Sequence, residues 1–183
     1  GKFDDNGRII KIAKWCEDME RLDIIKGEPE VIELEVFQQL YNNTHILLKK
    51  DKRNSPNIDL AMKAMLMIGL NTASTLIDLS RLKKNEIDLE NRTLSTRRKK
   101  TGQVKKVAYL WDNTVKDLQA YLDSRTDESP YVFLSRTGTA YTDSGLRKLF
   151  KRYRRNLNLP DTVEFKLLRK TFSTTAKDID IDP

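Results

Sequence analysis

The amino-acid sequence predicts a mostly α-helical fold with a small antiparallel β-hairpin or sheet, which is an α+β class. Three observations support this prediction. Apolar residues recur at three- and four-residue spacing through most of the 183 residues, as they do in amphipathic helices. Residues 87–110 instead contain short β-branched runs around a basic Lys-Thr-Gly turn, which indicates a hairpin. The hydrophobic fraction of 38% suffices for one buried core.

Two helices are predicted at the start of the chain. Residues 7–25 (GRIIKIAKWCEDMERLDII) place Ile12, Trp15 and Met19 on one apolar stripe. A KGEPE segment interrupts this pattern, and residues 31–44 (VIELEVFQQLYNNT) then predict a second helix.

The most buried helix is expected at residues 58–70 (IDLAMKAMLMIGL), because apolar side chains occupy nearly all of its circumference. Ser55 and Pro56 precede this helix and predict its N-cap and its first turn. Residues 74–82 (STLIDLSRL) predict a further short helix.

The β region follows these helices. Strands are predicted at residues 93–96 and 104–110, and a small third strand is expected around Ile87. Residues 111–125 (WDNTVKDLQAYLDSR) return to helical spacing after an Asp-Asn-Thr start. Residues 129–142 (SPYVFLSRTGTAYT) predict another strand and a turn.

Two amphipathic helices complete the predicted fold. In residues 143–159, Leu146, Phe150 and Tyr153 belong to one apolar face, and basic residues cover the other. Residues 165–176 (FKLLRKTFSTTA) have an apolar face as well, and they carry three cations among apolar and small hydroxylated residues.

The charge of the chain is positive and unevenly distributed. The formal net charge is +7 and the pI is about 9.4. Residues 1–40 have a net charge of −4, so residues 41–183 have a net charge of +11. This balance favours a polyanionic partner, either nucleic acid or an anionic surface, bound by the later part of the chain.

Several classes of protein are excluded by composition. Cys16 is the only cysteine and His45 the only histidine, so a disulfide framework, a Ser-His-Asp triad or a multi-histidine metal site has no residues to form it. The sequence contains no GxxxxGK[ST] phosphate loop, no long apolar span and no secretory signal. We therefore expect no metal, no small-molecule cofactor and no membrane association, and a cytoplasmic location.

Two basic regions are candidates for contact with phosphate. Residues 92–106 carry seven Lys or Arg residues and no acid, which favours an anionic partner over a solvated surface. Residues 146–155 carry six and no acid, and here a solvated helix face is an equal alternative. The residues expected to contact DNA are Arg97, Arg98, Lys99, Lys105, Lys106, Arg147 and Lys151.

Four stretches, in order along the chain, resemble the catalytic domain of the tyrosine recombinases, the phage integrase family. Residues 64–91 (AMLMIGLNTASTLIDLSRLKKNEIDLEN) are similar to its buried helix, short helix and first strand. Residues 96–110 (TRRKKTGQVKKVAYL) resemble the hairpin with the catalytic lysine. Residues 131–153 (YVFLSRTGTAYTDSGLRKLFKRY) resemble the connecting strand, turn and helix, and residues 165–176 resemble the His-x-x-Arg helix.

The resemblance implies a tyrosine-recombinase catalytic-domain-like fold for residues 28–183, lacking its C-terminal end. Residues 1–27 would then be the tail of a preceding core-binding domain or a linker helix. In this family a tyrosine attacks a DNA phosphodiester and forms a 3′-phosphotyrosyl link. Two arginines and a lysine or histidine stabilise the charge of the transition state, without a metal.

Three catalytic residues are implied by the resemblance. Arg169 matches the second catalytic arginine, and its planar fork suits two phosphate oxygens. Lys100 matches the hairpin lysine, which donates a proton to the leaving 5′-oxygen. Lys166 stands where the family usually has histidine, and it is a poorer proton shuttle near neutral pH. Lys170 is expected to face outward or to support the helix.

The first catalytic arginine of the family has no counterpart in this chain. An alignment anchored on Asp78 puts Thr75 at its position, and one anchored on Gly69 puts Asn71 there. Tyr141 and Tyr153 come too early in the chain to be the nucleophile, which is expected beyond Pro183.

Three functions therefore remain open. The first is a DNA strand-exchange enzyme, and the second is a recombinase-like protein that binds DNA but has lost the chemistry. The third, a basic helical domain for RNA or a protein partner, leaves the ordered motifs as coincidence. The resemblance implies double-stranded DNA as the partner, with assembly of several copies on DNA as a further expectation.

Overall fold

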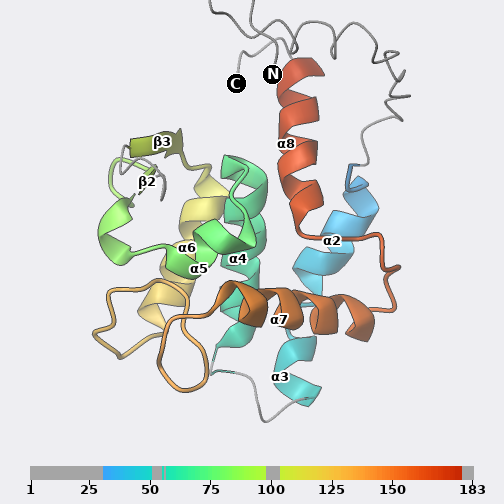
Figure 1. Ribbon diagram of the computed structural model, residues 1–183, viewed down its shortest axis with the longest axis horizontal. Coiled ribbons are helices and arrows are strands. Elements are labelled where there is room, and N and C mark those ends of the chain that lie inside the picture. Colours follow the sequence, from blue (N-terminus) through green and yellow to red (C-terminus); the bar gives the residue numbers. More distant parts are fainter. Residues whose placement is uncertain (1–30, 51–54, 56, 98–103, 179–183) are drawn as a thin grey trace, which may run out of the picture.

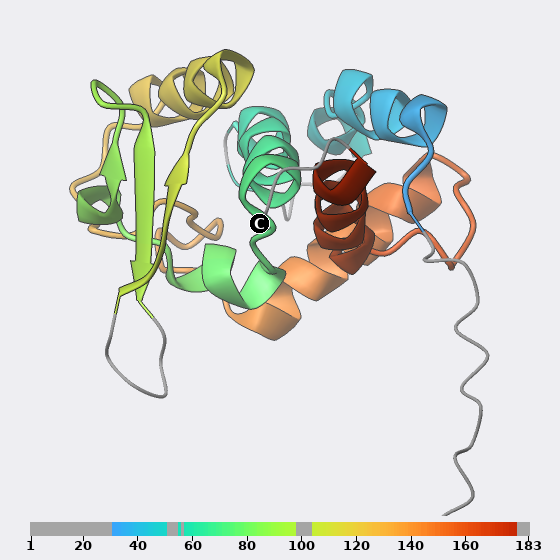
Figure 2. The same cartoon turned by 90° about the horizontal axis from the view of Figure 1, so that it is seen from above.

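The computed structural model describes residues 31–50, 55, 57–97 and 104–178. Its central element is helix α4 (Ile58–Thr72), most of whose residues are buried. Figure 2 shows the β-sheet and helix α6 (Asp112–Asp123) on one side of α4, with α2 (Leu34–Asn42) and α8 (Lys166–Asp178) on the other. The prediction of a deeply buried helix at residues 58–70 is confirmed.

The start of α4 differs from the prediction. Its N-cap is Asn57, in the left-handed conformation with φ of 58°, so the predicted cap at Ser55 is wrong. The side chain of Asn57 instead donates a hydrogen bond of 2.9 Å to the carbonyl of Ser124, just beyond α6. Asparagine tolerates this backbone region better than most residues do, which explains why it occupies the position.

The chain turns sharply after α4. Ala73 ends the helix in the left-handed conformation, with φ of 55°. Thr75 then caps the short helix α5 (Leu76–Arg81) through a reciprocal pair of hydrogen bonds with Asp78. This capping box fixes the direction of α5, because it satisfies backbone N–H groups that have no partner within the helix.

The β region is a three-stranded antiparallel sheet in the order β1-β2-β3. A 3₁₀ turn η1 (Lys84–Glu86) leads into β1 (Ile87–Asp88), which pairs with β2 (Thr93–Arg97), and β2 pairs with β3 (Val104–Tyr109). The predicted third strand around Ile87 is therefore confirmed. The register of β2 and β3 shifts between Thr96 and Arg97, next to residues 98–103, which lie outside the described residues.

The segment between α6 and α7 (Asp143–Asn156) contains no regular strand within its described residues. The strand predicted at residues 129–142 is instead represented by two isolated bridges, Lys83 with Tyr131 and Leu134 with Ala140. Arg125 holds this segment in place, because its guanidinium donates to the carbonyl of Tyr131 at 2.8 Å and also bonds Asp127. Side-chain bonds replace the missing ladder.

The remaining helices join α4 through one apolar core. Figure 1 shows α7 crossing in front of the lower part of α4, with the short helix α3 (Ile46–Lys50) beneath it and α8 rising above it. The apolar face of α7 is buried as predicted, including Leu146, Phe150 and Tyr153. The helix predicted at residues 7–25, and with it the proposed boundary at residue 27, lies outside the described residues.

Candidate nucleic-acid interface

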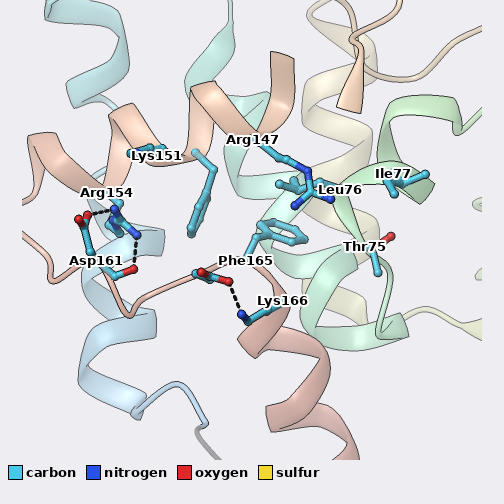
Figure 3. Close-up of a pocket in the computed structure, with 11 residues that line it drawn as sticks. Thr75, Leu76, Ile77, Arg147, Lys151, Arg154, Asp161, Phe165 and Lys166 are labelled. Atoms are coloured by element: carbon cyan, nitrogen blue, oxygen red, sulfur yellow. Dashed lines mark hydrogen bonds and ion pairs between the residues drawn. The ribbon is translucent and has the colours of Figure 1, made fainter. Parts of the chain in front are cut away.

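A pocket of about 600 Å³ opens between three helices: the start of α5, the middle of α7 and the start of α8 (Figure 3). Its floor is apolar, because Phe150 of α7 meets Phe165 edge to face, with ring centroids 5.5 Å apart. Its rim carries four cations and two carboxylates. These charged residues are Arg147, Lys151, Arg154, Lys166, Asp161 and Glu164.

Helix α7 brings two of these cations together through its amphipathic pattern. Arg147 and Lys151 are four residues apart, so they lie on the same exposed face of the helix. Arg147 also pairs with Asp143 one turn earlier, with Nε 3.0 Å from Oδ2, and this exposed ion pair orients its guanidinium. An exposed pair of this kind contributes little stability, so its main effect is on position.

Arg154 is a structural cation although it lines the pocket. Its side chain is only 6% exposed, and it donates to the carbonyls of Asp161 and Val163, at 2.6 and 3.2 Å, as well as to the Asp161 carboxylate. These bonds hold the loop between α7 and α8 against the helix. Its charge is thereby committed inside the protein, and it is a poor candidate for contact with a ligand.

Lys166 is the first residue of α8 and is held by Glu164 in the loop before it. The distance from Nζ to Oε2 is 2.6 Å, and the two side chains are 62% and 48% exposed. The hydrogen bond from Lys166 lowers the pKa of the Glu164 carboxyl below its usual range, with a smaller electrostatic contribution from the same lysine. The pocket therefore contains its own anion next to Lys166.

The packing around α4 distinguishes Asn71 from Thr75, the two residues that the resemblance offers for the position of the first arginine. Asn71 is buried, and its amide donates 3.1 Å to the carbonyl of Tyr109 and accepts 2.8 Å from the N–H of Trp111. It thus ties α4 to the end of β3 and does not reach the pocket. Thr75, in contrast, lines the pocket at the start of α5.

The close approach of α8 to α4 positions Lys166. Gly69 of α4 faces Phe165, and a Cβ atom there would lie 2.7 Å from Cζ of that ring. Such a distance is a steric clash, so the absence of a side chain at this position lets Phe165 settle against α4. The ring of Phe165 in turn fixes the start of α8, where Lys166 begins the helix.

The predicted site residues fall into three groups. Arg147, Lys151 and Lys166 are brought together around the pocket. Arg169 lies one turn further along α8 and is exposed, outside the described lining of the pocket, and Lys170 is exposed as predicted. The third group belongs to the hairpin: Arg97, Lys105 and Lys106 lie in β2 and β3 with undescribed side chains, and Arg98, Lys99 and Lys100 lie outside the described residues.

Two features of the pocket were not predicted from the sequence, the ion pair of Glu164 and the burial of Arg154. Glu164 attracts no notice there, because a carboxylate two residues before a lysine is common, and only the loop geometry makes the pair. The burial of Arg154 was not predicted either, because Arg154 is one of six basic residues in residues 146–155 that were assigned to one exposed face. One sequence signal for this burial is the spacing, because Arg154 follows the buried Tyr153 and precedes the buried Leu157 by three residues.

Two further findings bear on the class of protein. Among the described residues, no group of three or more His, Cys, Asp or Glu side chains is arranged to hold a metal ion. In the same part of the chain, no helix is both long and apolar enough to cross a membrane.

Fold and site together define a mostly helical domain that has a small three-stranded sheet and a basic pocket between α5, α7 and α8. The family model described as the phage integrase family matches residues 30–181, so this chain belongs to the phage integrase family. No curated protein matches the chain.

Solved structures show the same fold. The crystal structure of XerA recombinase has a TM-score of 0.67 at 19% identity, over 84% of this chain and 53% of that one. The Tn1549 transposon integrase in complex with a circular intermediate DNA has a TM-score of 0.64 at 18% identity, over 88% and 57%. A lambda integrase dimer bound to a COC′ core site has a TM-score of 0.57 at 13% identity, over 82% and 41%. The chain thus spans about half the length of these proteins.

Proposed function

We propose that this chain binds double-stranded DNA as the catalytic-domain portion of a site-specific recombinase, with a backbone phosphate at the pocket between α5, α7 and α8. The observation that carries the proposal is the convergence of Arg147, Lys151 and Lys166 on one pocket from two helices. Cations that neutralise phosphates supply the sequence-independent part of DNA affinity. The family match and the DNA-bound relatives support the choice of partner.

For strand exchange, Arg169 and Lys100 are the proposed partners of Lys166. Arg169, Lys166 and the hairpin residue Lys100 would stabilise the charge that develops on a phosphoryl group during transfer. Arg169 is a donor to the non-bridging oxygens in this proposal, and Lys100 is the acid for the leaving oxygen. The proposal includes no metal and no small-molecule cofactor.

A second function, DNA binding without cleavage, is favoured by one observation. Thr75, one of the two positions that the resemblance offers for the family's first arginine, lines the pocket without a charge, and its hydroxyl donates 2.8 Å to Asp78. A missing transition-state donor costs about two to three orders of magnitude in rate.

Binding is tested by titrating duplex DNA at several salt concentrations. The Lys151→Ala/Lys166→Ala variant is expected to bind DNA more weakly. The slope of the logarithm of its affinity against the logarithm of salt concentration should be smaller by about 0.9 per lost phosphate contact. A Lys116→Ala variant is the control, because Lys116 is an exposed cation. It belongs to α6, a helix that lies on the side of the molecule away from α7 (Figure 2). Equal loss in both variants would contradict the proposed pocket.

Cleavage is tested separately, on a chain long enough to carry its own nucleophile. Labelled DNA is incubated with the protein and separated by denaturing electrophoresis. A covalent protein–DNA adduct identifies a strand-exchange enzyme, and loss of the adduct in an Arg169→Ala variant assigns the arginine. Binding without any adduct identifies the second function.

A further inference from the structure

A second pocket of about 270 Å³ lies on the other flank of α7, between this helix and the turn that precedes it. Three cations line it: Arg136 from the turn, and Lys148 and Arg152 from α7. The hydroxyl-bearing residues Ser135 and Thr137 complete its polar wall. It shares no lining residue with the pocket between α5, α7 and α8.

Both pockets carry an excess of positive charge, but they differ in whether carboxylates line them. The first contains the carboxylates of Asp161 and Glu164, which engage Arg154 and Lys166. The described residues that line the second pocket include no carboxylate. Arg136 and Lys148 therefore have no carboxylate of the described lining between them, and an anion placed beside them relieves their mutual repulsion.

The turn that forms one wall of the second pocket is well braced. The N–H of Ser135 donates 2.8 Å to the carbonyl of Thr139, and the N–H of Gly138 donates 3.0 Å to that of Ser135. Gly138 has φ of 74°, a conformation that suits glycine. The hydroxyls of Ser135, Thr137 and Thr139 lie 2.9 to 3.1 Å from one another. Arg136 is thus presented from a fixed loop.

The opposite wall is set by helical spacing. Lys148 and Arg152 are four residues apart and share one flank of α7, whereas Arg147 and Lys151 share the neighbouring flank. Successive residues are separated by about 100° around a helix, so the two pairs point to different pockets. Helix α7 therefore presents basic side chains to two separate pockets rather than to one continuous surface.

We propose that the second pocket is a phosphate site, and that its occupant is a backbone phosphate of the same DNA duplex that the first pocket contacts. Arg136 provides a planar fork for two phosphate oxygens, and Lys148 provides a mobile point charge. The hydroxyls of Ser135 and Thr137 already bond each other and Thr139, so one of these bonds must break before a hydroxyl donates to a phosphate. This inference rests on the proposed DNA-binding function.

The test compares two variants that lose the same charges. Arg136→Ala/Lys148→Ala removes an arginine and a lysine from the second pocket, and both side chains are exposed, so the fold should be retained. Arg155→Ala/Lys116→Ala removes an arginine and a lysine that are also exposed but line neither pocket. Circular dichroism and a thermal melt check that each variant is folded.

The readout is the slope of the logarithm of DNA affinity against the logarithm of salt concentration. The Arg136→Ala/Lys148→Ala variant is expected to bind several-fold more weakly, with a slope reduced by about 0.9, the value for one phosphate contact. The control variant is expected to keep most of the wild-type slope. Equal slopes and affinities for the two variants would overturn the proposal.

A second measurement separates DNA from a small phosphate compound as the occupant. The melting temperature is recorded with and without inorganic pyrophosphate. One outcome is that pyrophosphate raises the melting temperature of the wild type but not that of Arg136→Ala/Lys148→Ala, while this variant and the control variant bind DNA equally. In that case the pocket binds a free phosphate compound and the DNA proposal is wrong. If DNA binding weakens as expected, the duplex is the source.

Failure of this inference is distinguishable from failure of the proposed function. When Lys151→Ala/Lys166→Ala weakens DNA binding and Arg136→Ala/Lys148→Ala does not, the first pocket stands and the second is rejected. The reverse result rejects the first pocket and supports the second. A wild-type chain that ignores DNA at low salt overturns both.

Discussion

The ammonium nitrogen of Lys166 lies 2.6 Å from a carboxylate oxygen of Glu164, two residues earlier in the chain. This pair sits at the rim of the pocket where a DNA phosphate is proposed to bind. A phosphate must therefore compete with a carboxylate of the protein for the same lysine. Glu164 then reduces the affinity of the free protein for DNA, and it does so through Lys166.

Removing the competing carboxylate should tighten DNA binding. In Glu164→Gln the amide no longer attracts the lysine, and affinity should rise by about 1.5- to 5-fold, since an exposed ion pair is worth roughly 0.2–1 kcal/mol. The control Glu128→Gln makes the same change of net charge in an exposed loop. Fluorescence anisotropy with labelled duplex measures both. Equal affinities of the two variants would show that general charge, and not this pair, decides the effect.

A guanidinium at residue 75 should strengthen the pocket. Thr75→Arg adds a cation where Thr75 lines the pocket, and DNA affinity should rise roughly tenfold or more, as expected for a hydrogen bond to a charged group. The same change removes the cap of α5 and should cost about 1 kcal/mol of stability. Thr126→Arg, in an exposed loop, is the charge-matched control. The prediction is contradicted if both variants bind DNA alike.

The contact between Gly69 and Phe165 should link core packing to the site. Gly69→Ala places a Cβ atom 2.7 Å from the ring and pushes the start of α8 away, which should destabilise the fold by about 1 kcal/mol or more. DNA binding should weaken as well, because Lys166 moves with α8. Urea unfolding and DNA titration measure the two effects.

A second substitution keeps the Gly69 prediction specific. Phe165→Leu provides room for the new Cβ atom, so the Gly69→Ala/Phe165→Leu variant should be more stable than the sum of the two single effects indicates. A purely additive result would mean that the two residues do not act on each other, and the proposed link to Lys166 would be lost.

Stability should fall in acid through Asp127. The hydrogen bond from Arg125 lowers the pKa of Asp127 from 3.8 to about 2, so the pair stabilises the fold fully above pH 4. This contribution is lost as the pH falls from about 4 to about 2, because the native carboxylate becomes protonated in that range. Asp127 is partly exposed, so the loss should be about 1 kcal/mol after solvent screening.

The matched variant for this prediction is Asp127→Asn. It should unfold more easily than the wild type at pH 7 and should lack the part of the acid dependence that Asp127 causes. Glu128→Asn, at the neighbouring exposed position, should leave that dependence unchanged. Urea midpoints at pH 7, 4 and 2.5 provide the comparison, and parallel curves for wild type and Asp127→Asn would contradict the assignment.

Much of the fold was predictable because helical and strand periodicity are local. The spacing of apolar residues predicted that one face of α7 is buried and that α4 is buried on nearly all sides, and both predictions are confirmed. The hairpin was predictable from its turn for the same reason. The predicted cap at Ser55 was wrong, because Asn57 caps α4. The side chain of Asn57 bonds Ser124, 67 residues away, and local sequence does not reveal such a contact.

The candidate site was predictable only in part. Basic spacing and the family resemblance singled out Arg147, Lys151 and Lys166, and the fold gathers these three around one pocket. The roles of Glu164 and Arg154 were not predictable, because burial and ion pairing depend on how the loop before α8 returns to α7. The catalytic assignments of Arg169 and Lys100 stay predictions.

The sequence by itself determined the class of the fold, the order of its elements and the excess of positive charge. These properties depend on composition and on short-range periodicity, which every segment carries within itself. Only the tertiary structure decided that Thr75 rather than Asn71 lines the pocket, and that α7 serves two pockets. The physical reason is that the angle and distance between helices are set by contacts such as Gly69 with Phe165, which join residues far apart in the chain.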